Sequence, residues 1–463
     1  MWIRDLRLTM NINMMITING KYTKAVVHTD NIEKEAIAQI QEIVDCPAFR
    51  DQTVHYMPDV HAGMNSTVGF TATLGDYVNP SHIGGDIGCT VSMILLDKVL
   101  PKDKYAEFEH RLRKDVPMGK EIHDSTVFDE KKFMTFLTSE FNKMRQQWPE
   151  RLSELPIQVT EKWISQQLTR LNTNPAMFYH AIGTLGGGNH MIEYDESADA
   201  QHSAVIVHCG SRNFGQKVCK HWVSVAAQNQ KKKNVDKNRI KELRAQFKED
   251  WKQTHWKDKT GYDEALKKFI EERTASSDSS ILGYLSGDDM NGYLCDLCFA
   301  QLYARWNHMI IHERVREILS KYGINVSEEI FCTHNYISPA DKIMRKGAIC
   351  AAEGEKIIVP FNMRDGVAVC MGKGNPDWNY SCSHGSGRSM SRNAARKNIS
   401  MDEYRGAMEG IYSTCISQDT LDESPQAYKD TEEIKNLIAE TCDILYIMPT
   451  KINLKAGDED DED

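Results

Sequence analysis

The sequence has no apolar run that could cross a bilayer. A membrane-spanning helix needs about 20 consecutive, mostly apolar residues, and the 463-residue chain, 41% hydrophobic and 26% charged, contains no such stretch. Residues 1–20 also lack an apolar segment followed by a small-residue cleavage site, so no secretory signal is expected. These absences predict a protein that acts in the cytoplasm and not in a membrane.

Two further patterns are missing. No G-x-x-x-x-G-K-[ST] motif is present, so a nucleotide would have to be bound without a P-loop. The twelve cysteines are scattered without even spacing, which favours reduced thiols over a disulfide framework and offers no closed set of structural zinc ligands. Cys295 and Cys298 do form a C-x-x-C, but the leucines around them predict a buried helix face and core thiols.

Basic residues are fewer than acidic ones. The formal net charge of −10 argues against a protein that coats nucleic acid through its overall charge. It leaves RNA open as a substrate, because local basic patches decide that question. The last seven residues, 457–463, read GDEDDED, and their like charges predict a solvated, disordered tail.

The order of patterns along the chain predicts an α+β fold with one large core, formed by residues 1–456. Short β-prone runs broken by glycine alternate with helical segments, and no internal repeat is evident. The expected elements are a strand and a helix over 17–44, polar helices over 101–171, an insertion of exposed, charged helices over 217–280, a long amphipathic helix over 289–319, and short strands with Gly- and Ser-rich loops over 330–454.

Five potential metal ligands stand beside glycine-rich turns or at strand ends. Asp86 and Cys89 lie in GGDIGC, and His190 closes GTLGGGNH. His208 follows the apolar run AVIV, and His334 follows EEIFCT. Loops at strand ends are where active-site groups gather. The sequence therefore predicts that these five side chains share one site.

A carboxylate, a thiolate and three imidazoles suit a borderline divalent ion such as Mn²⁺, Zn²⁺ or Fe²⁺. A thiolate can bridge two ions, so five ligands could hold a pair. Taken singly, each histidine is more often a structural residue and the cysteine a core residue. The repeated setting, a histidine at a strand end within a glycine loop, favours the metal site.

A second group of residues lies in SCSHGSGRSMSR, residues 381–392. Here His384 sits among small residues that allow a bulky ligand to approach, and Arg388 and Arg392 would share one face of a helix beginning here. Lys373, in a glycine turn just before this segment, adds positive charge, and Arg345 and Lys346 in RKGAICAAEGE supply more. A solvated Ser/Gly loop with surface arginines is the plainer alternative. From chemistry alone, the residues indicate a metal-dependent enzyme that handles phosphate.

The sequence resembles the RtcB family of RNA-splicing ligases over nearly its whole length. Ten shared elements run in order: MPDVHAG, GGDIGC, GTLGGGNHMIE, HCGSR, the DM-x-x-YL…YARWN helix, THNY, RKGA, GKGNP, SCSHGSGR-x-MSR and AYKD. The resemblance implies the α+β fold of that family and a centre of two Mn²⁺ ions. It also implies that Asp86, Cys89, His190, His208 and His334 are the ligands, with Cys89 as the bridge.

The same resemblance assigns roles to the second group. His384 matches the histidine that attacks the α-phosphate of GTP and becomes guanylylated. The positions that match nucleotide contacts are Asn189, Glu193, Arg388, Tyr428 and Lys455, of which Tyr428 and Lys455 match contacts to guanine. Arg212, Arg388 and Arg392 are expected to clamp phosphates of RNA or GTP.

The implied activity is GTP-dependent joining of RNA 3′-phosphate or 2′,3′-cyclic phosphate ends to 5′-hydroxyl ends, through an RNA 3′-pp-5′G end. Archease is the activator that the resemblance suggests as a partner. One alternative is a metal-dependent phosphodiesterase or phosphatase acting on RNA ends without guanylylation. A non-catalytic RNA- or protein-binding paralogue is another, although binding alone would require neither the ligands nor His384.

Several positions depart from the usual pattern of the family. Gly85 precedes Asp86, Cys209 and Asn213 stand in HCGSRNFG, and residues 360–366 read PFNMRDG. Together with the charged segment 217–280, these differences suggest a divergent bacterial-type paralogue with a narrower RNA repair substrate than tRNA exons.

Overall fold

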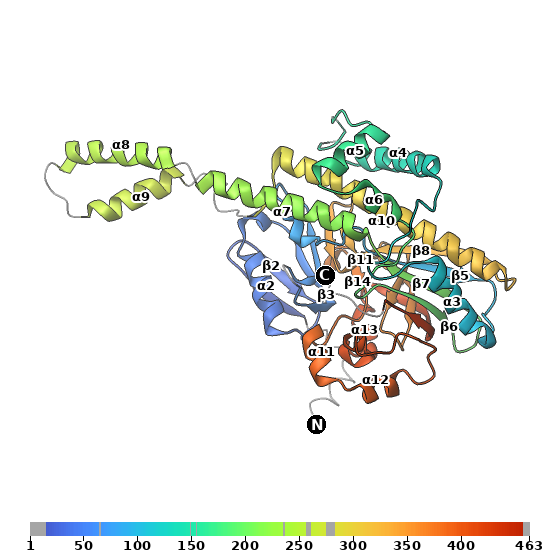
Figure 1. Cartoon of the computed structure of the whole chain (residues 1–463). Coiled ribbons are helices and arrows are strands. Elements are labelled where there is room, and N and C mark those ends of the chain that lie inside the picture. Colours follow the sequence, from blue (N-terminus) through green and yellow to red (C-terminus); the bar gives the residue numbers. More distant parts are fainter. Residues whose placement is uncertain are drawn as a thin grey trace, which may run out of the picture.

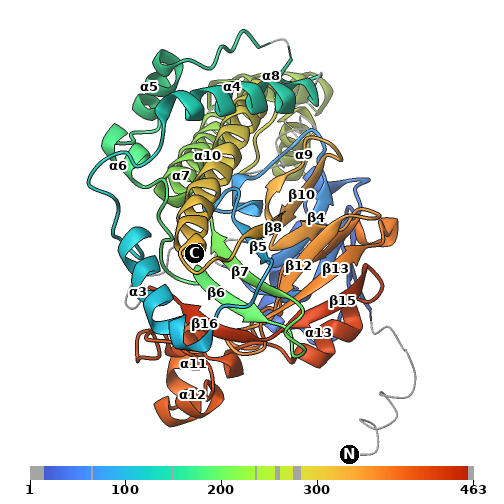
Figure 2. The same cartoon turned by 90° about the vertical axis from the view of Figure 1, so that its right-hand side faces the viewer.

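The computed structural model describes residues 15–63, 66–148, 150–153, 155–234, 237–255, 261–274 and 283–456. Within them, a six-stranded and a five-stranded sheet form the centre of the body, and helices cover them (Figures 1 and 2). The predicted α+β class is confirmed. The expected acidic tail, 457–463, lies outside the described residues.

The six-stranded sheet is built mainly from the N-terminal third. Its order is β1 (Ile16–Asn19), β2 (Lys24–Val27), β3 (Val54–His61), β4 (Val68–Thr73), β10 (Ile343–Lys346) and β9 (Asn335–Ile337). Only β2 and β3 pair in parallel; the other neighbours are antiparallel. The N-terminal region therefore contributes two short strands before its helix, where the sequence predicted one.

The five-stranded sheet is antiparallel throughout and carries most of the predicted metal ligands. Its order is β16 (Thr450–Leu454), β6 (Met191–Glu196), β7 (Ser203–Cys209), β5 (Thr90–Leu96) and β8 (Val326–Thr333). Every residue of β7 is buried, as expected for a continuous apolar run in a central strand that is covered on both faces. Two small sheets complete the core, one of β12 (Lys356–Pro360), β13 (Val367–Gly372) and β15 (Cys442–Met448), the other of β11 (Ala348–Cys350) and β14 (Ser381–Ser383).

The helices lie mostly on the outside of the sheets. They are α2 (Lys34–Val44), α3 (Tyr105–Asp115), α4 (Glu130–Gln146), α5 (Glu161–Arg170), α6 (Pro175–His180), α7 (Arg212–Asn234), α8 (Lys237–His255), α9 (Tyr262–Thr274), α10 (Gly287–Ser320), α11 (Arg392–Asn398), α12 (Met401–Ala407) and α13 (Thr431–Ile438). The helices predicted over 101–171 are confirmed as α3, α4 and α5.

Helix α10 corrects one expectation. Its length agrees with the helix predicted over 289–319, but it is buried around most of its circumference and is not a surface amphipathic helix. It packs against α7 and α4 on one side and against β5 and β7 on the other (Figure 2). Cys295 and Cys298 are buried in it, and burial raises the pKa of both thiols, as fits core residues.

Helices α7, α8 and α9 form an arm. The first half of α7 packs on the body through Phe214, Val218 and Trp222, which are buried. Beyond it, α8 and α9 project away from the body as a helical hairpin (Figure 1). Phe247 of α8 contacts Phe269 of α9 with ring centroids 4.9 Å apart, so the hairpin has an apolar seam of its own. Helix α7 already begins at Arg212, and residues 275–280 of the predicted insertion lie outside the described residues.

Candidate metal centre and active site

Strand register brings four of the predicted metal ligands to one edge of the five-stranded sheet. Thr90, the first residue of β5, pairs with Cys209 near the end of β7 and with Thr333 at the end of β8. Residues 89, 208 and 334 therefore lie side by side, although they are far apart in sequence. Met191, the first residue of β6, pairs with His208, which adds His190 to the same edge.

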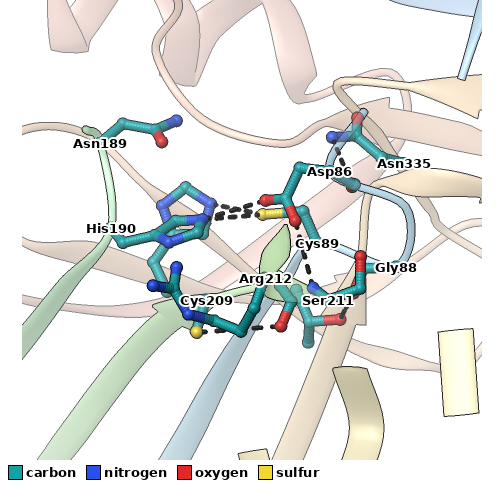
Figure 3. Close-up of polar contacts among 12 residues, drawn as sticks. Asp86, Gly88, Cys89, Asn189, His190, Cys209, Ser211, Arg212 and Asn335 are labelled. Atoms are coloured by element: carbon teal, nitrogen blue, oxygen red, sulfur yellow. Dashed lines mark hydrogen bonds and ion pairs between the residues drawn. The ribbon is translucent and has the colours of Figure 1, made fainter. Parts of the chain in front are cut away.

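The side chains converge as this register demands. Cys89 Sγ lies 3.2 Å from His208 Nε2 and 3.7 Å from His190 Nε2. His208 Nε2 is 3.3 Å from His334 Nε2. On the other side, His190 Nε2 is 3.0 Å from Asp86 Oδ2 (Figure 3). All five predicted ligands thus face one small volume.

The five ligands divide into two overlapping sets of three. Cys89, His208 and His334 form one set and Asp86, Cys89 and His190 the other, with the ligand atoms of each set within 4.8 Å of one another. Cys89 belongs to both sets, so its thiolate would be shared if two ions were held here. The donor set of thiolate, imidazole and carboxylate suits borderline divalent ions. The residues present therefore fit a dinuclear centre.

Contacts around the ligands hold them in the form that binds metal. His190 Nδ1 donates to the Leu185 carbonyl oxygen at 3.0 Å, which turns Nε2 toward Asp86 and Cys89 as the atom that could bind an ion. The backbone N–H of Ser211 donates to Asp86 Oδ1 at 3.1 Å (Figure 3). Gly210 leaves room for this carboxylate, since a Cβ at Gly210 would lie 1.9 Å from Asp86 Oδ1.

Burial fixes the protonation states of the cluster. It holds the pKa of His208 and of His334 well below the usual value, and neighbouring histidines add to the effect. Burial alone would raise the pKa of Asp86, but the hydrogen bond and charge of His190 outweigh it and bring the pKa to about 2. At neutral pH His208 and His334 are thus neutral imidazoles and Asp86 is a carboxylate, the forms that bind metal.

His384 lies next to this cluster at the end of β14. Its ring centroid is 4.9 Å from that of His334, and its side chain is 17% exposed. Its Nδ1 lies 2.6 Å from Asp59 Oδ2, and its backbone N–H donates to the same oxygen at 3.0 Å. Because Nδ1–H donates to the carboxylate, the lone pair of Nε2 is left free, which is the tautomer a nucleophile requires.

Asp59 is a functional residue that the sequence argument missed. It belongs to β3, on the other large sheet, and is fully buried. It lies within MPDVHAG, one of the shared motifs, but 325 positions separate it from His384. A single aspartate in a β-prone run does not indicate from sequence which residue it contacts, so the pairing of Asp59 with His384 could not be predicted.

A cavity opens beside His384. The space between its walls is about 720 Å³, a volume that includes open solvent. Asn189, Arg388, Tyr428 and Lys455 line it together with His384. His208 also lines it, so the cavity reaches the metal cluster.

Glu193 lies on β6, behind the residues that line this cavity. It is fully buried, and Asn453 of the neighbouring strand donates to its Oε1. Burial raises the pKa of its carboxyl. Its Oε2 has no hydrogen-bond partner among the described residues, which is a costly state for a buried polar atom unless a ligand supplies a donor.

The predicted phosphate-binding arginines are paired with protein groups. Helix α11 begins at Arg392, so Arg388 lies in the preceding loop, and the expectation that the two share a helix face is wrong. Arg392 Nη1 lies 2.7 Å from both Asp422 Oδ2 and Glu423 Oε1. Arg388 Nη2 donates to the Asp422 carbonyl at 2.5 Å.

Arg212 and the other basic residues singled out in the sequence are also bonded to protein groups. Arg212 is buried with φ 54°, in the left-handed region at the turn into α7, and donates to Thr184 Oγ1 and to the Gly119 carbonyl. Arg345 is fully buried and paired with Asp341 at 2.8 Å, so its charge is balanced within the protein. Lys346 Nζ donates to the Ser81 carbonyl, and Lys373 pairs with Asp443 at 2.9 Å.

Two general expectations can be compared with the structure. All twelve cysteines are within the described residues and free of disulfides. Among the helices that the structure describes, none combines the length and the apolar character needed to cross a bilayer.

Similarity to known proteins agrees with this site. Residues 39–448 match the family described as tRNA-splicing ligase RtcB. The RNA-splicing ligase RtcB of Escherichia coli K12 is 26% identical over 471 residues, covering 96% of this chain and 100% of the relative. An RNA-splicing ligase RtcB homolog of Entamoeba histolytica is 25% identical, covering 86% of this chain and 78% of its own. The tRNA-splicing ligase RtcB of Methanococcus maripaludis is 22% identical, with 88% of each chain covered. The matched region spans most of the sequence and contains nearly every element of the site, and the chain therefore belongs to the tRNA-splicing ligase RtcB family.

Proposed function

We propose that this protein is an RNA ligase that uses GTP and Mn²⁺ to join RNA 3′-phosphate or 2′,3′-cyclic phosphate ends to 5′-hydroxyl ends. The observation that carries the proposal is the pairing of His384 with buried Asp59 directly beside the predicted metal ligands. The names of the relatives, RNA-splicing and tRNA-splicing ligases, support the choice of RNA as substrate.

His384 is the nucleophile in the first step. Its Nδ1–H donates to Asp59, and Nε2 attacks the α-phosphorus of GTP, so that a P–N bond forms as the P–O bond to pyrophosphate breaks. The ring becomes positively charged when it carries GMP, and the Asp59 carboxylate stabilises that charge. A hydroxyl-bearing side chain would need a separate base; the imidazole does not.

Transfer to RNA follows from the same site. A 2′,3′-cyclic end is first hydrolysed to a 3′-phosphate. An oxygen of the RNA 3′-phosphate attacks the phosphorus on His384, which restores the imidazole and gives a 3′-pp-5′G end. The 5′-hydroxyl of the second strand then attacks the RNA 3′-phosphorus and expels GMP.

Asp86, Cys89, His190, His208 and His334 would hold two Mn²⁺ ions. Bound there, the ions supply Lewis-acid stabilisation of charge on the reacting phosphates. Asn189, Glu193, Arg388, Tyr428 and Lys455 are the proposed nucleotide contacts, with Arg212 and Arg392 near the phosphates.

The test is self-labelling with α-³²P-GTP and Mn²⁺, followed by a denaturing gel. We expect a labelled band in the wild type, no label in His384→Ala, and full label in the control His110→Ala, whose side chain is exposed on α3. A phosphoramidate is cleaved by acid and survives base, so the label should show that pattern.

Two results would count against the proposal. Label retained in His384→Ala would place the nucleophile elsewhere. No label in a wild type with Mn²⁺ bound, even after archease is added, would favour a metal-dependent phosphodiesterase or phosphatase that acts on RNA ends. Hydrolysis of a 2′,3′-cyclic phosphate by that protein would then identify the alternative.

A further inference from the structure

One buried carboxylate is bonded to most of the side chains that are proposed to contact the nucleotide. Glu423 ends the short 3-10 helix Leu421–Glu423 and is 3% exposed. Its Oε2 accepts from the Tyr428 hydroxyl at 2.7 Å and from Lys455 Nζ at 2.8 Å. Its Oε1 lies 2.7 Å from Arg392 Nη1 and 3.4 Å from Arg388 Nη1.

These partners come from three separate parts of the chain. Arg388 precedes α11 and Arg392 is its first residue, Tyr428 precedes α13, and Lys455 follows β16. Glu423 does not line the cavity, whereas all four partners do. The Glu423 carboxylate therefore lies behind the residues that line the cavity and fixes side chains that face the ligand.

Charge explains why a carboxylate is needed at this place. Lys455 is 2% exposed, and an ammonium buried without a countercharge is costly. Burial would raise the pKa of Glu423, but Lys455, Arg392 and Arg388 outweigh it and hold that pKa well below its usual range. Glu423 is thus an anion at neutral pH and balances the cations around it.

Its hydrogen bonds also fix what the wall offers to a ligand. The single hydroxyl proton of Tyr428 is donated to Glu423, so the Tyr428 oxygen can only accept from a ligand. Lys455 donates to Glu423 and, at 3.3 Å, to the Asn189 carbonyl, which leaves one of its three N–H groups to donate toward the cavity.

We propose that Glu423 is a positioning residue for the nucleotide: it touches no ligand itself, but it holds Tyr428, Lys455 and Arg388 in the arrangement that binds GTP. The inference rests on the proposed function, since it takes the cavity beside His384 to be the GTP pocket. It adds a residue to which neither the sequence motifs nor the cavity lining assigns a role.

The test measures binding apart from chemistry. Fluorescent methylanthraniloyl-GTP is titrated into the Mn²⁺-loaded full chain, and self-labelling is followed in parallel. In Glu423→Gln, which keeps the shape and removes the charge, we expect the Kd to rise at least about tenfold and the maximal labelling rate to change less than about threefold. Glu409→Gln, an exposed glutamate in the neighbouring groove, should bind like the wild type.

A merely structural role would show itself differently. Glu423→Asp keeps the charge but draws the carboxylate back by one methylene, so it should bind more weakly than the wild type and more tightly than Glu423→Gln. Equal weakness of the two variants would overturn the proposal, as would wild-type affinity in Glu423→Gln. If Glu423→Gln does not fold, Glu423→Asp with an unchanged melting temperature decides, because unchanged binding in it would overturn the proposal and weakened binding would support it.

The two proposals fail in distinguishable ways. A wild type that binds the GTP analogue but is not labelled would overturn the guanylylation mechanism, and the affinities of the Glu423 variants would still decide the role of that residue. A wild type that does not bind the analogue would overturn both.

Discussion

At the scale of single residues, the site depends on oxygen atoms that reach it from other parts of the fold. Asp59 Oδ2 accepts both the Nδ1–H and the backbone N–H of His384, so one atom sets the ring orientation and the tautomer. Asp86 Oδ1 is held in the same manner by the backbone of Ser211. Each functional side chain therefore has a supporting contact whose loss should affect chemistry more than folding.

Asp59→Asn tests the first of these contacts. The amide can still accept a hydrogen bond, but it removes the charge that stabilises a positively charged, guanylylated ring. We expect the rate of self-labelling to fall by about 10² to 10⁴, with little change in the GTP concentration that gives half-saturation. A variant labelled at the wild-type rate would show that the carboxylate serves the fold and not the nucleophile.

Gly210→Ala tests the second contact. The added Cβ would lie 1.9 Å from Asp86 Oδ1 and 2.5 Å from Asp86 Cγ, so the carboxylate must move away from the metal site. We expect Mn²⁺ affinity to fall by about tenfold or more, in line with the loss of a supporting contact to a ligand. Calorimetric titration of Mn²⁺ measures the effect.

Gly406→Ala is the matched control for that prediction. A Cβ at Gly406 would meet nothing within 4 Å, and the residue lies within α12 far from the ligands in sequence. It should bind Mn²⁺ like the wild type and be slightly more stable, because alanine favours a helix over glycine. Equal Mn²⁺ affinity in Gly210→Ala would show that Asp86 adapts without cost.

The sequence could predict that the proposed metal ligands lie together, but not which residues support them. Asp86, Cys89 and the three histidines are rare residue types in repeated settings, so the pattern itself points to a site. Asp59 and Glu423 are ordinary carboxylates, and only the folded chain shows that each faces functional groups far away in sequence. The phosphate-clamp prediction for Arg388 and Arg392 did not include their partner Glu423 for the same reason.

At the scale of elements, the metal site rests on a buried polar network between β5, β8 and α10. Ser92 Oγ lies 2.8 Å from His308 Nδ1 and 2.7 Å from His312 Nε2. His308 Nε2–H donates to the Cys209 carbonyl at 2.9 Å, next to His208, and His312 Nδ1 lies 2.7 Å from Glu329 Oε1. This network fixes α10 to the edge of the sheet that holds the ligands. The histidines on the predicted helix did not indicate this network, because hydrophobic periodicity predicts which residues are buried and not which groups they bond.

Glu329→Gln tests this network through pH. The hydrogen bond with His312, helped by Arg316 and opposed by burial, lowers the pKa of Glu329 from 4.5 to about 2. A folded-state pKa below the unfolded one stabilises the protein fully above the unfolded value, and the contribution is lost as the pH falls toward the folded value. The difference in melting temperature between wild type and variant should thus be largest at neutral pH and shrink as the pH drops from about 5 to 3. Metal-free protein gives the measurement, since it excludes the competition of protons with the ions. A difference that stays constant over this range would mean that the charge of Glu329 contributes nothing.

At the scale of the whole molecule, the body and the arm are distinct. The body contains both large sheets and all the proposed catalytic and metal-binding side chains, whereas α8 and α9 project from the end of α7 (Figure 1). The charged composition of the segment 217–280 predicted exposed helices, and the structure describes such helices over most of it. Composition could not predict that these helices would form a projecting hairpin, because the direction of the hairpin depends on where α7 is held to the body. Trp222 of α7 makes that contact: its Nε1–H donates to Asp296 of α10 at 2.6 Å.

Removing the hairpin tests whether the arm is separable from the catalytic body. A variant in which a short Gly-Ser linker replaces residues 235–282 keeps all of α7 and its contacts with α10. Since His384, Asp59 and the metal ligands lie on other elements, effects on them should be small, as for changes at distant, independent sites. We expect self-labelling with GTP within about twofold of the full chain and a nearly unchanged melting temperature. A fall in labelling with an intact fold would show instead that the hairpin completes the active site, and comparison of RNA joining by the two proteins would then measure what it contributes to the substrate.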